Sequence, residues 1–354
     1  MNQNLKIALL IIGIIITGSI EHITIPIMVT HFNSLYFIVI VSTIHGCLNY
    51  GIVLLVATRG KFVIPTQIRT IIIAGSFNAL MSICFIYSAN PVRTPVVIQS
   101  IFLGLAIIPT VFFRKIILNK IITYNKYLII PSIILLIASV IISVVPLVGK
   151  SEFAASFWIL MYLGAIILLS FDNVMQEKYV SDTADTSFVN KISFVLFSSI
   201  FQLITLVIFF WVELLFGYTD RPFAVFLDSF HTYITNWSNF LVLELFILDC
   251  LILYLLCVYL NSLSTNFNMI VTNVTNQSVA IFFAIFPNLN HGIHHPLYII
   301  IICLCCNLVS VVLWIFGEKN IPDSKNISDP KTDNNSICMD IPKEKLDNSQ
   351  QIDI

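Results

Sequence analysis

Long apolar segments follow one another along most of this chain and restrict what it can fold into. About 20 apolar residues are enough for a helix to cross a bilayer core of about 30 Å. Charged residues make up only 10% of the sequence, compared with roughly 25% in an average soluble domain. We therefore predict an all-α integral membrane protein of ten transmembrane helices. The predicted spans are residues 5–28, 35–57, 68–89, 94–113, 127–147, 153–172, 191–217, 240–260, 266–287 and 297–316.

The distribution of basic residues predicts the orientation. Lys and Arg favour the cytosolic side of a membrane protein. If the N-terminus is cytosolic, fifteen of the 18 basic residues lie inside, and only Arg93, Lys150 and Arg221 lie outside. Both termini are therefore predicted to be cytosolic.

Ten spans divide into two halves of five, residues 1–147 and 148–317. Because five is odd, the second half enters the membrane from the opposite side and is inverted relative to the first. Many secondary transporters have such inverted repeats, with the substrate bound between them near the midplane. Residues 318–354 are rich in Asn, Asp, Ser and Lys, a composition that predicts a disordered cytosolic tail.

Polar side chains are concentrated in the ninth span, in "NMIVTNVTNQSVA". Helical spacing places Thr272 and Asn276 on one face, and Asn273 and Gln277 on the next. Hydrogen bonds to neighbouring helices, worth about 0.6 kcal/mol each, would explain single residues of this kind. So many polar groups in one stretch favour the lining of a cavity. Asn78 in the third span is a further candidate.

Ionisable groups inside spans are costly, at about 2.5–3.5 kcal/mol near the bilayer centre, and usually functional. Asp249 lies near the predicted midplane and is the first candidate for proton coupling. Glu21 and His22 lie in the outer third of the first span, where reaching to the interface is an equally good explanation. The histidines of "HGIHH" (291–295) would gain charge in an acidic lumen, and the alternative is an exposed loop without a role.

Sequence motifs of soluble enzymes are missing from the chain. It has no phosphate-binding G-x-x-x-x-G-K-S/T loop, no H-E-x-x-H and no G-x-S-x-G, so neither ATP-driven pumping nor familiar hydrolase chemistry is supported. The eight cysteines are scattered, and we expect no metal or cofactor. The expected partners are a small solute and the lipid bilayer, with no nucleic acid.

Four short fragments resemble one transporter family. They are "IQSIFLGLAIIP" (98–109), "FDNVMQEKYV" (171–180), "SIFQLIT" (199–205) and "STNFNMIVT" (264–272). In this order, they resemble the chloroquine-resistance-transporter-like proteins, a branch of the drug/metabolite transporter superfamily. The resemblance implies that superfamily's fold, ten helices as an inverted repeat of five. It also implies that Gly104 allows close packing beside a central cavity and that Pro109 bends its helix.

The same resemblance implies a function. Proteins of this kind move amino acids, peptides, thiol peptides or drug-like cations across a vacuolar or lysosomal membrane, often with protons. The chain departs from the family pattern at two places, and both bear on which substrate it carries. Residues 218–239 form a short connection without cysteine, and "TNQS" (275–278) is more polar than is usual in the family. The cavity residues that the resemblance implies are Gln99, Ser100, Asn173, Ser199, Gln202, Thr205, Thr265 and Thr272.

Two alternatives remain open. A nucleotide-sugar carrier of the same superfamily would need basic residues at the midplane to hold an anion, and no Lys or Arg lies in the middle of a predicted span. A membrane receptor, scaffold or enzyme would not need so polar a ninth span.

The topology gives a first prediction. Cysteine-accessibility mapping with an impermeant reagent should place residue 2, after substitution by cysteine, and the native Cys338 on the same, cytosolic side. Termini on opposite sides would contradict both the ten-span topology and the family resemblance.

Overall fold

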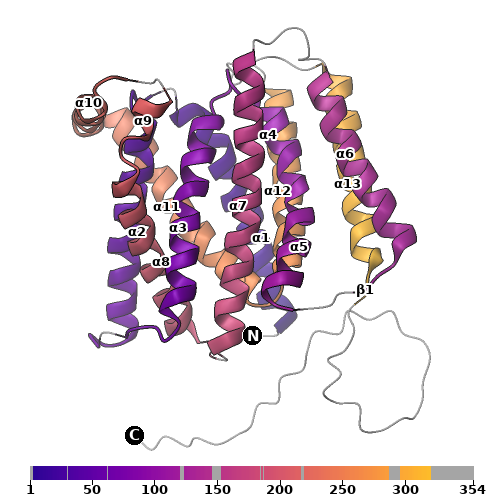
Figure 1. Cartoon of the computed structure of the whole chain (residues 1–354), viewed down its shortest axis with the longest axis horizontal. Helices are drawn as coiled ribbons and strands as arrows, with labels where there is room; N and C mark the ends of the chain where they lie inside the picture. The colour runs from indigo at the N-terminus through magenta and orange to yellow at the C-terminus, as the bar shows by residue number, and fades with distance from the viewer. Residues whose placement is uncertain are drawn as a thin grey trace, which may run out of the picture. The chain divides into compact units, whose positions relative to one another are not determined.

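Helices that run between the two ends of one bundle make up nearly all of the computed structural model (Figure 1). The predicted tail beyond Lys319 and the histidines at 291, 294 and 295 lie outside the described residues. The structure describes residues 3–29, 31–61, 63–119, 123–145, 153–183, 185, 187–216, 219–286 and 296–319.

Nine helices within these ranges are long and apolar enough to cross a membrane, which confirms an all-α, multi-pass membrane protein. The helix from Val96 to Ile117 is counted once, although a short irregular turn divides it into α4 and α5. The nine are α1 (Gln3–Met28), α2 (Leu35–Ala57), α3 (Ile68–Ser88), α4 with α5 (Val96–Leu103 and Ile107–Ile117), α6 (Lys126–Val144), α7 (Phe153–Thr183), α8 (Phe188–Ile208), α11 (Trp237–Asn261) and α13 (Leu297–Gly317).

The remaining predicted span corresponds to α12 (Thr265–Ile285), which at 21 residues is as long as α3, α8 and α13. Its amides and hydroxyls leave it outside the nine apolar helices. The shorter elements are α9 (Val212–Leu215), α10 (Pro222–Thr235) and two strands, β1 (Thr123–Tyr124) and β2 (Glu318–Lys319). Figure 1 looks along α10 while the long helices run vertically, so α10 lies across the bundle.

Short polar residues begin many of the long helices. A Ser or Asn before the first helical residue accepts a hydrogen bond from a backbone N–H that has no partner within the helix. Such a cap satisfies a backbone group within the chain itself, which matters most where little water is present. The capping residues are Ser34, Asn125, Ser187, Asn236 and Ser264.

The interruption between α4 and α5 lies where Pro109 predicts it. Proline lacks an N–H and clashes with the carbonyl four residues earlier, which here belongs to Leu105. Residues 104–106 accordingly form a short 3₁₀ turn. A side chain at Gly104 would meet the amide of Asn273 at 3.1 Å, so glycine allows α12 to approach closely here.

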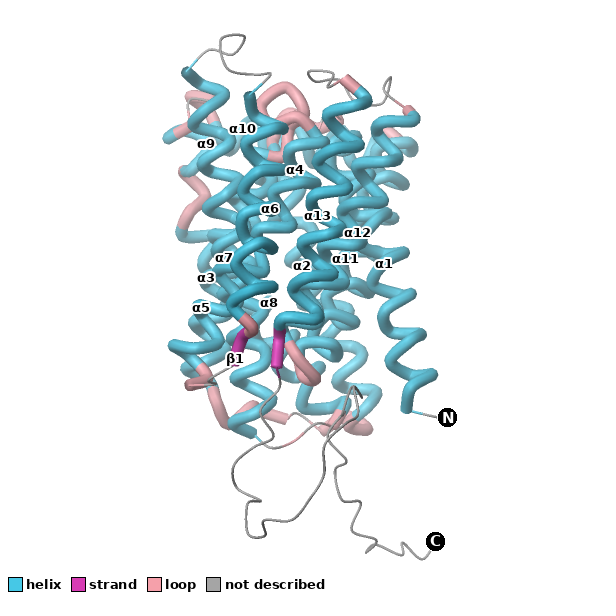
Figure 2. Tube along the Cα trace, turned by 90° about the vertical axis from the view of Figure 1, so that its right-hand side faces the viewer, coloured by secondary structure: helices cyan, strands magenta, loops and turns pink. Residues whose placement is uncertain are grey.

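The described chain up to Lys319 forms one compact unit in which the two predicted halves pack on each other. The closest packing joins α1 with α11 and α12, α3 with α7 and α8, α2 with α8, and α6 with α13. Figure 1 shows α6 and α13 side by side at one edge. We call the end where α1 begins and α13 ends the N side, and the opposite end the far side (Figure 2).

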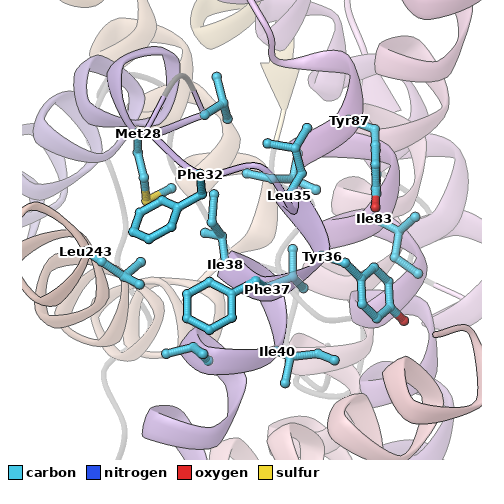
Figure 3. Close-up of a cluster of buried hydrophobic side chains, with 14 of the residues drawn as sticks. Met28, Phe32, Leu35, Tyr36, Phe37, Ile38, Ile40, Ile83, Tyr87 and Leu243 are labelled. Atoms are coloured by element: carbon cyan, nitrogen blue, oxygen red, sulfur yellow. The ribbon is translucent and has the colours of Figure 1, made fainter. Parts of the chain in front are cut away.

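A hydrophobic cluster fills the far side of the bundle around the start of α2 (Figure 3). Met28, Phe32 and Leu243 lie close together there, with Tyr36 and Tyr87 on the opposite side of the view. On the outside of the bundle, α1 exposes an apolar stripe at helical spacing. An exposed apolar stripe of this length is expected to face lipid. The residues of that stripe are Leu5, Leu9, Ile12, Ile16 and Ile20.

The crossing of α3 and α8 depends on a small residue, as is common between membrane helices. A Cβ added to Gly75 would lie 2.4 Å from the carbonyl oxygen of Ser198 and 2.9 Å from the Cβ of Phe201. The two backbones can approach this closely only because Gly75 has no side chain.

We therefore predict that Gly75→Ala lowers the free energy of unfolding by about 1–3 kcal/mol, because the helices must separate. Thermal unfolding in detergent would measure the effect. Gly164→Ala on α7 is the matched control, since its Cβ would meet no described atom within 4 Å. It should leave stability unchanged or raise it by up to about 1 kcal/mol. Equal effects of the two substitutions would contradict the close crossing.

Candidate functional site

A cavity of about 280 Å³ lies within the bundle, between the N side and the far-side hydrophobic cluster. Residues from both predicted halves line it, on α1 to α4 and on α7, α8, α11 and α12. No described residue of α6 or α13 reaches it. Its volume is at the small end of the range for ligand pockets, about 300–1,000 Å³. We call it the central cavity.

The central cavity brings together several of the residues predicted from the sequence, although they come from five different helices. On the wall formed by α3 and α8, the amide of Asn78 donates to Gln202 (3.3 Å) and Gln202 donates to Ser82 (3.2 Å). The predicted residues in the lining are Glu21, His22, Asn78, Asn173, Ser199, Gln202 and Thr272.

Other predicted residues have structural contacts outside the lining. Gln99 donates to the carbonyls of Ala89 (2.8 Å) and Thr94 (2.6 Å), and so fastens the connection between α3 and α4. Ser100 bonds to the carbonyl of Val96 within its own helix. Thr205 bonds to Ser76 on α3. These contacts explain the polar atoms without a ligand.

The polar face of α12 is divided between the cavity and its neighbours. Thr272 lines the cavity, whereas Asn273 faces Gly104 and accepts a bond from Gln277 (3.3 Å). Asn276 is completely buried outside the lining. From the sequence, we predicted that the polar side chains of α12 line a cavity. In the structure only some of them do so, and the others contact neighbouring residues.

Asp249, the first candidate for proton coupling, is buried but outside the cavity lining. It lies within electrostatic range of Glu21, whose carboxylate does line the cavity and accepts a weak bond from the thiol of Cys250 (3.6 Å). A proton on Asp249 would therefore act on a solute through Glu21. The proton-coupling role of Asp249, Glu21 and His22 stays a prediction.

The charged groups of the central cavity are carboxylates. Asp172 and Glu21 line it, together with the titratable ring of His22, and no described Lys or Arg does. Asp172 was not predicted as a site residue. Two acids without a basic residue favour an occupant that carries a positive charge.

Four side-chain amides form the N-side floor of the cavity, and we call them the amide cluster. Asn261 of α11 donates to Asn173 (2.5 Å) and Gln176 (2.7 Å) of α7. Asn268 of α12 donates to Asn261 (2.8 Å) and Asn173 (3.2 Å). All four are at most 3% exposed. The cluster thus joins three helices at a single point, and three of its members, all but Asn261, touch the cavity.

Below the amide cluster, a buried ion pair connects α5, α7 and α12. Arg114 donates to Glu177 at 3.0 Å, and the second oxygen of Glu177 accepts from the backbone N–H (3.1 Å) and hydroxyl (2.5 Å) of Thr265. The Glu177 carboxylate therefore also stabilises the positive end of α12. Glu318 of β2 lies 4.0 Å from Arg114 and accepts a bond from Asn266. These buried groups close the N side of the cavity.

Sequence reasoning missed the importance of Asp172, Gln176 and Glu177, although all three lie in the fragment "FDNVMQEKYV". One signal was available: Asp172 and Gln176 are four residues apart and share a helix face. Asn261 and Asn268 gave no such signal, because they come together only through the turn between α11 and α12.

No protein-family model matches the chain, and no curated protein is similar to it. The resemblance to chloroquine-resistance-transporter-like proteins therefore stays a prediction.

The buried ion pair gives a prediction about stability. Removing one partner leaves the other charge buried, which typically costs about 3–5 kcal/mol. Glu177→Ala should therefore strongly lower the thermal unfolding temperature in detergent.

The matched control is Asp182→Ala, on the same helix. Asp182 pairs with Lys178 at a similar distance, 3.1 Å, but both side chains are about one-third exposed. Exposed pairs contribute about 0.2–1 kcal/mol, so this variant should be nearly as stable as the wild type. An equally small effect of Glu177→Ala would show that the buried pair does not hold the N side together.

Proposed function

We propose that the chain is a secondary transporter that moves small cationic or zwitterionic solutes across an endomembrane by alternating access. The observation that carries the proposal is the central cavity, a largely apolar space with two carboxylates and no described basic residue in its lining, inside a bundle of membrane-spanning helices. A purely structural bundle would not need carboxylates beside such a space, because ionisable groups are costly there. Amino acids, peptides, thiol peptides and drug-like cations are the solute classes that fit.

The packing of the helices supports an inverted repeat of five plus five. The proposed exchange pairs α1 with α7, α2 with α8, α3 with α11, α4/α5 with α12, and α6 with α13. This exchange turns the α1–α11 contact into the α7–α3 contact, and the α1–α12 contact into the α7–α5 contact. All four of these helix pairs pack together in the structure. The α2–α8, α4–α12 and α6–α13 contacts map onto themselves and are also present. Such a pattern is expected of two inverted halves around a central site.

In the proposed cycle, the two halves rock about the central cavity. Asp249, with Glu21 and His22 nearer the solute, would take a proton from the acidic side and bias the opening. The excess of Lys and Arg on the N side supports cytosolic termini, and a vacuolar or lysosomal membrane would supply the acidic lumen. The direction from lumen to cytosol follows from the resemblance alone.

Two other functions are weaker candidates. A nucleotide-sugar carrier would bind an anionic substrate, which two carboxylates would repel. A receptor, scaffold or enzyme would not explain why two carboxylates line a cavity within the membrane-spanning bundle.

Uptake into proteoliposomes tests the proposal. Labelled amino acids, dipeptides, glutathione and a nucleotide sugar would be offered with and without an imposed pH gradient. We expect flux of a cation or zwitterion that increases with the gradient. Asp249→Asn should abolish the increase, while Asp182→Asn, at the exposed pair on α7, should leave it unchanged.

Each other result has a distinct meaning. Flux of the nucleotide sugar alone would assign the chain to the anion-carrying alternative. Full gradient-driven flux in the Asp249→Asn variant would remove Asp249 from proton coupling and leave transport intact. No flux of any solute by the folded protein would contradict the transporter proposal.

A further inference from the structure

Among the described residues that line the central cavity, Asp172 has a buried carboxylate oxygen that makes no hydrogen bond. It lies on α7 just above the amide cluster, lines the cavity and is 1% exposed. Its Oδ2 accepts a hydrogen bond from Gln176 (2.8 Å). Its Oδ1 has no hydrogen-bond partner among the described residues.

A buried acceptor without a partner requires an explanation, because nearly all such groups in proteins are satisfied. A buried carboxylate is more demanding still, since burying a charge is costly unless it is paired. No described Lys or Arg lines the cavity, so the protein does not supply a cationic partner there. Because Asp172 lines the cavity, an occupant of the cavity is in a position to supply the missing donor.

We propose that Asp172 recognises the positive charge of the solute, with Oδ1 accepting a hydrogen bond from an ammonium or guanidinium group. This inference rests on the proposed transport function and names the residue that selects the cation. Charge-assisted hydrogen bonds of this kind are among the strongest in proteins. A proton on Asp172 would also relieve the charge, but it would give no preference for a cationic solute over a neutral one of the same shape.

The position of Asp172 also links binding to the closed N side. Gln176 donates to Asp172 and accepts from Asn261, so it is shared between the solute site and the amide cluster. A cation on Oδ1 would polarise the same carboxylate that Gln176 contacts through Oδ2. Binding of the solute would therefore act through Gln176 on the hydrogen bond that joins α7 to Asn261 of α11.

Matched pairs of probes test the inference. Lysine and norleucine differ in one terminal ammonium group, and arginine and citrulline differ in the charge of one planar group. Equilibrium binding of each probe to the purified full chain would be measured by isothermal titration. We expect the wild type to bind the cationic member of at least one pair more tightly by roughly ten- to a hundredfold, the usual effect of a charged hydrogen bond.

Asp172→Asn should remove this preference, so that the members of the pair bind equally. The substitution keeps the size of the side chain and an oxygen that can accept from Gln176. Asp182→Asn, on the same helix but at the exposed pair with Lys178, should retain the full preference. If the Asp172→Asn variant does not fold, the Asp172→Ser variant is used in its place, because it also removes the charge without adding volume.

The outcomes separate this inference from the function on which it rests. An undiminished cation preference in a folded Asp172 variant would overturn the inference and leave transport standing. A wild-type protein that transports solutes but treats both members of each pair alike would do the same. A wild-type protein that binds no probe and shows no flux would overturn the inference and the proposed function together.

Discussion

The absence of water inside a bilayer is the constraint on which the rest of this structure depends. Every backbone polar group there must find a partner within the protein, so the chain crosses the membrane as helices, several of which begin with a capping Ser or Asn. The same constraint gathers buried side-chain polarity into joints such as the amide cluster and the Arg114–Glu177 pair. These joints fix the relative positions of α5, α7, α11 and α12, and the shape of the central cavity follows from those positions.

Much of the fold could be predicted from the sequence, because span length and helix breakers are local properties. The apolar segments became helices, and Pro109 and Gly104 marked the interruption and the close approach to α12. The site was less predictable. Gln99 was as good a candidate as Asn78, but two backbone carbonyls in the connection before α4 accept the hydrogen bonds of its amide. A polar residue in a span shows that a hydrogen-bond partner is needed, but the sequence does not indicate whether that partner is another residue or a ligand.

Asp172 and Asp249 illustrate the same limit for charged groups. The depth of Asp249 along its predicted span made it the first candidate, yet it is not among the residues that line the cavity. Asp172 lies nearer the predicted end of its span, where a charge attracts little notice. Because α7 runs on to Thr183, the residue is buried well inside the bundle. Helical periodicity gives the angle between residues on one helix, but the neighbour that each face meets depends on the packing of all the others.

Buried hydrogen bonds hold both ends of the bundle, and this bears on how the proposed rocking motion could proceed. The far side combines the apolar packing of Phe32 and Phe37 with hydrogen bonds from Ser34 to Ser229 and Glu213. The N side is held by directional bonds, and each buried group left unsatisfied costs about 1–3 kcal/mol. Opening the N side therefore requires substitute partners. Water can supply them once the opening is wide, whereas a solute bound at Asp172 is already next to Gln176, the α7 residue that accepts a hydrogen bond from Asn261 of α11.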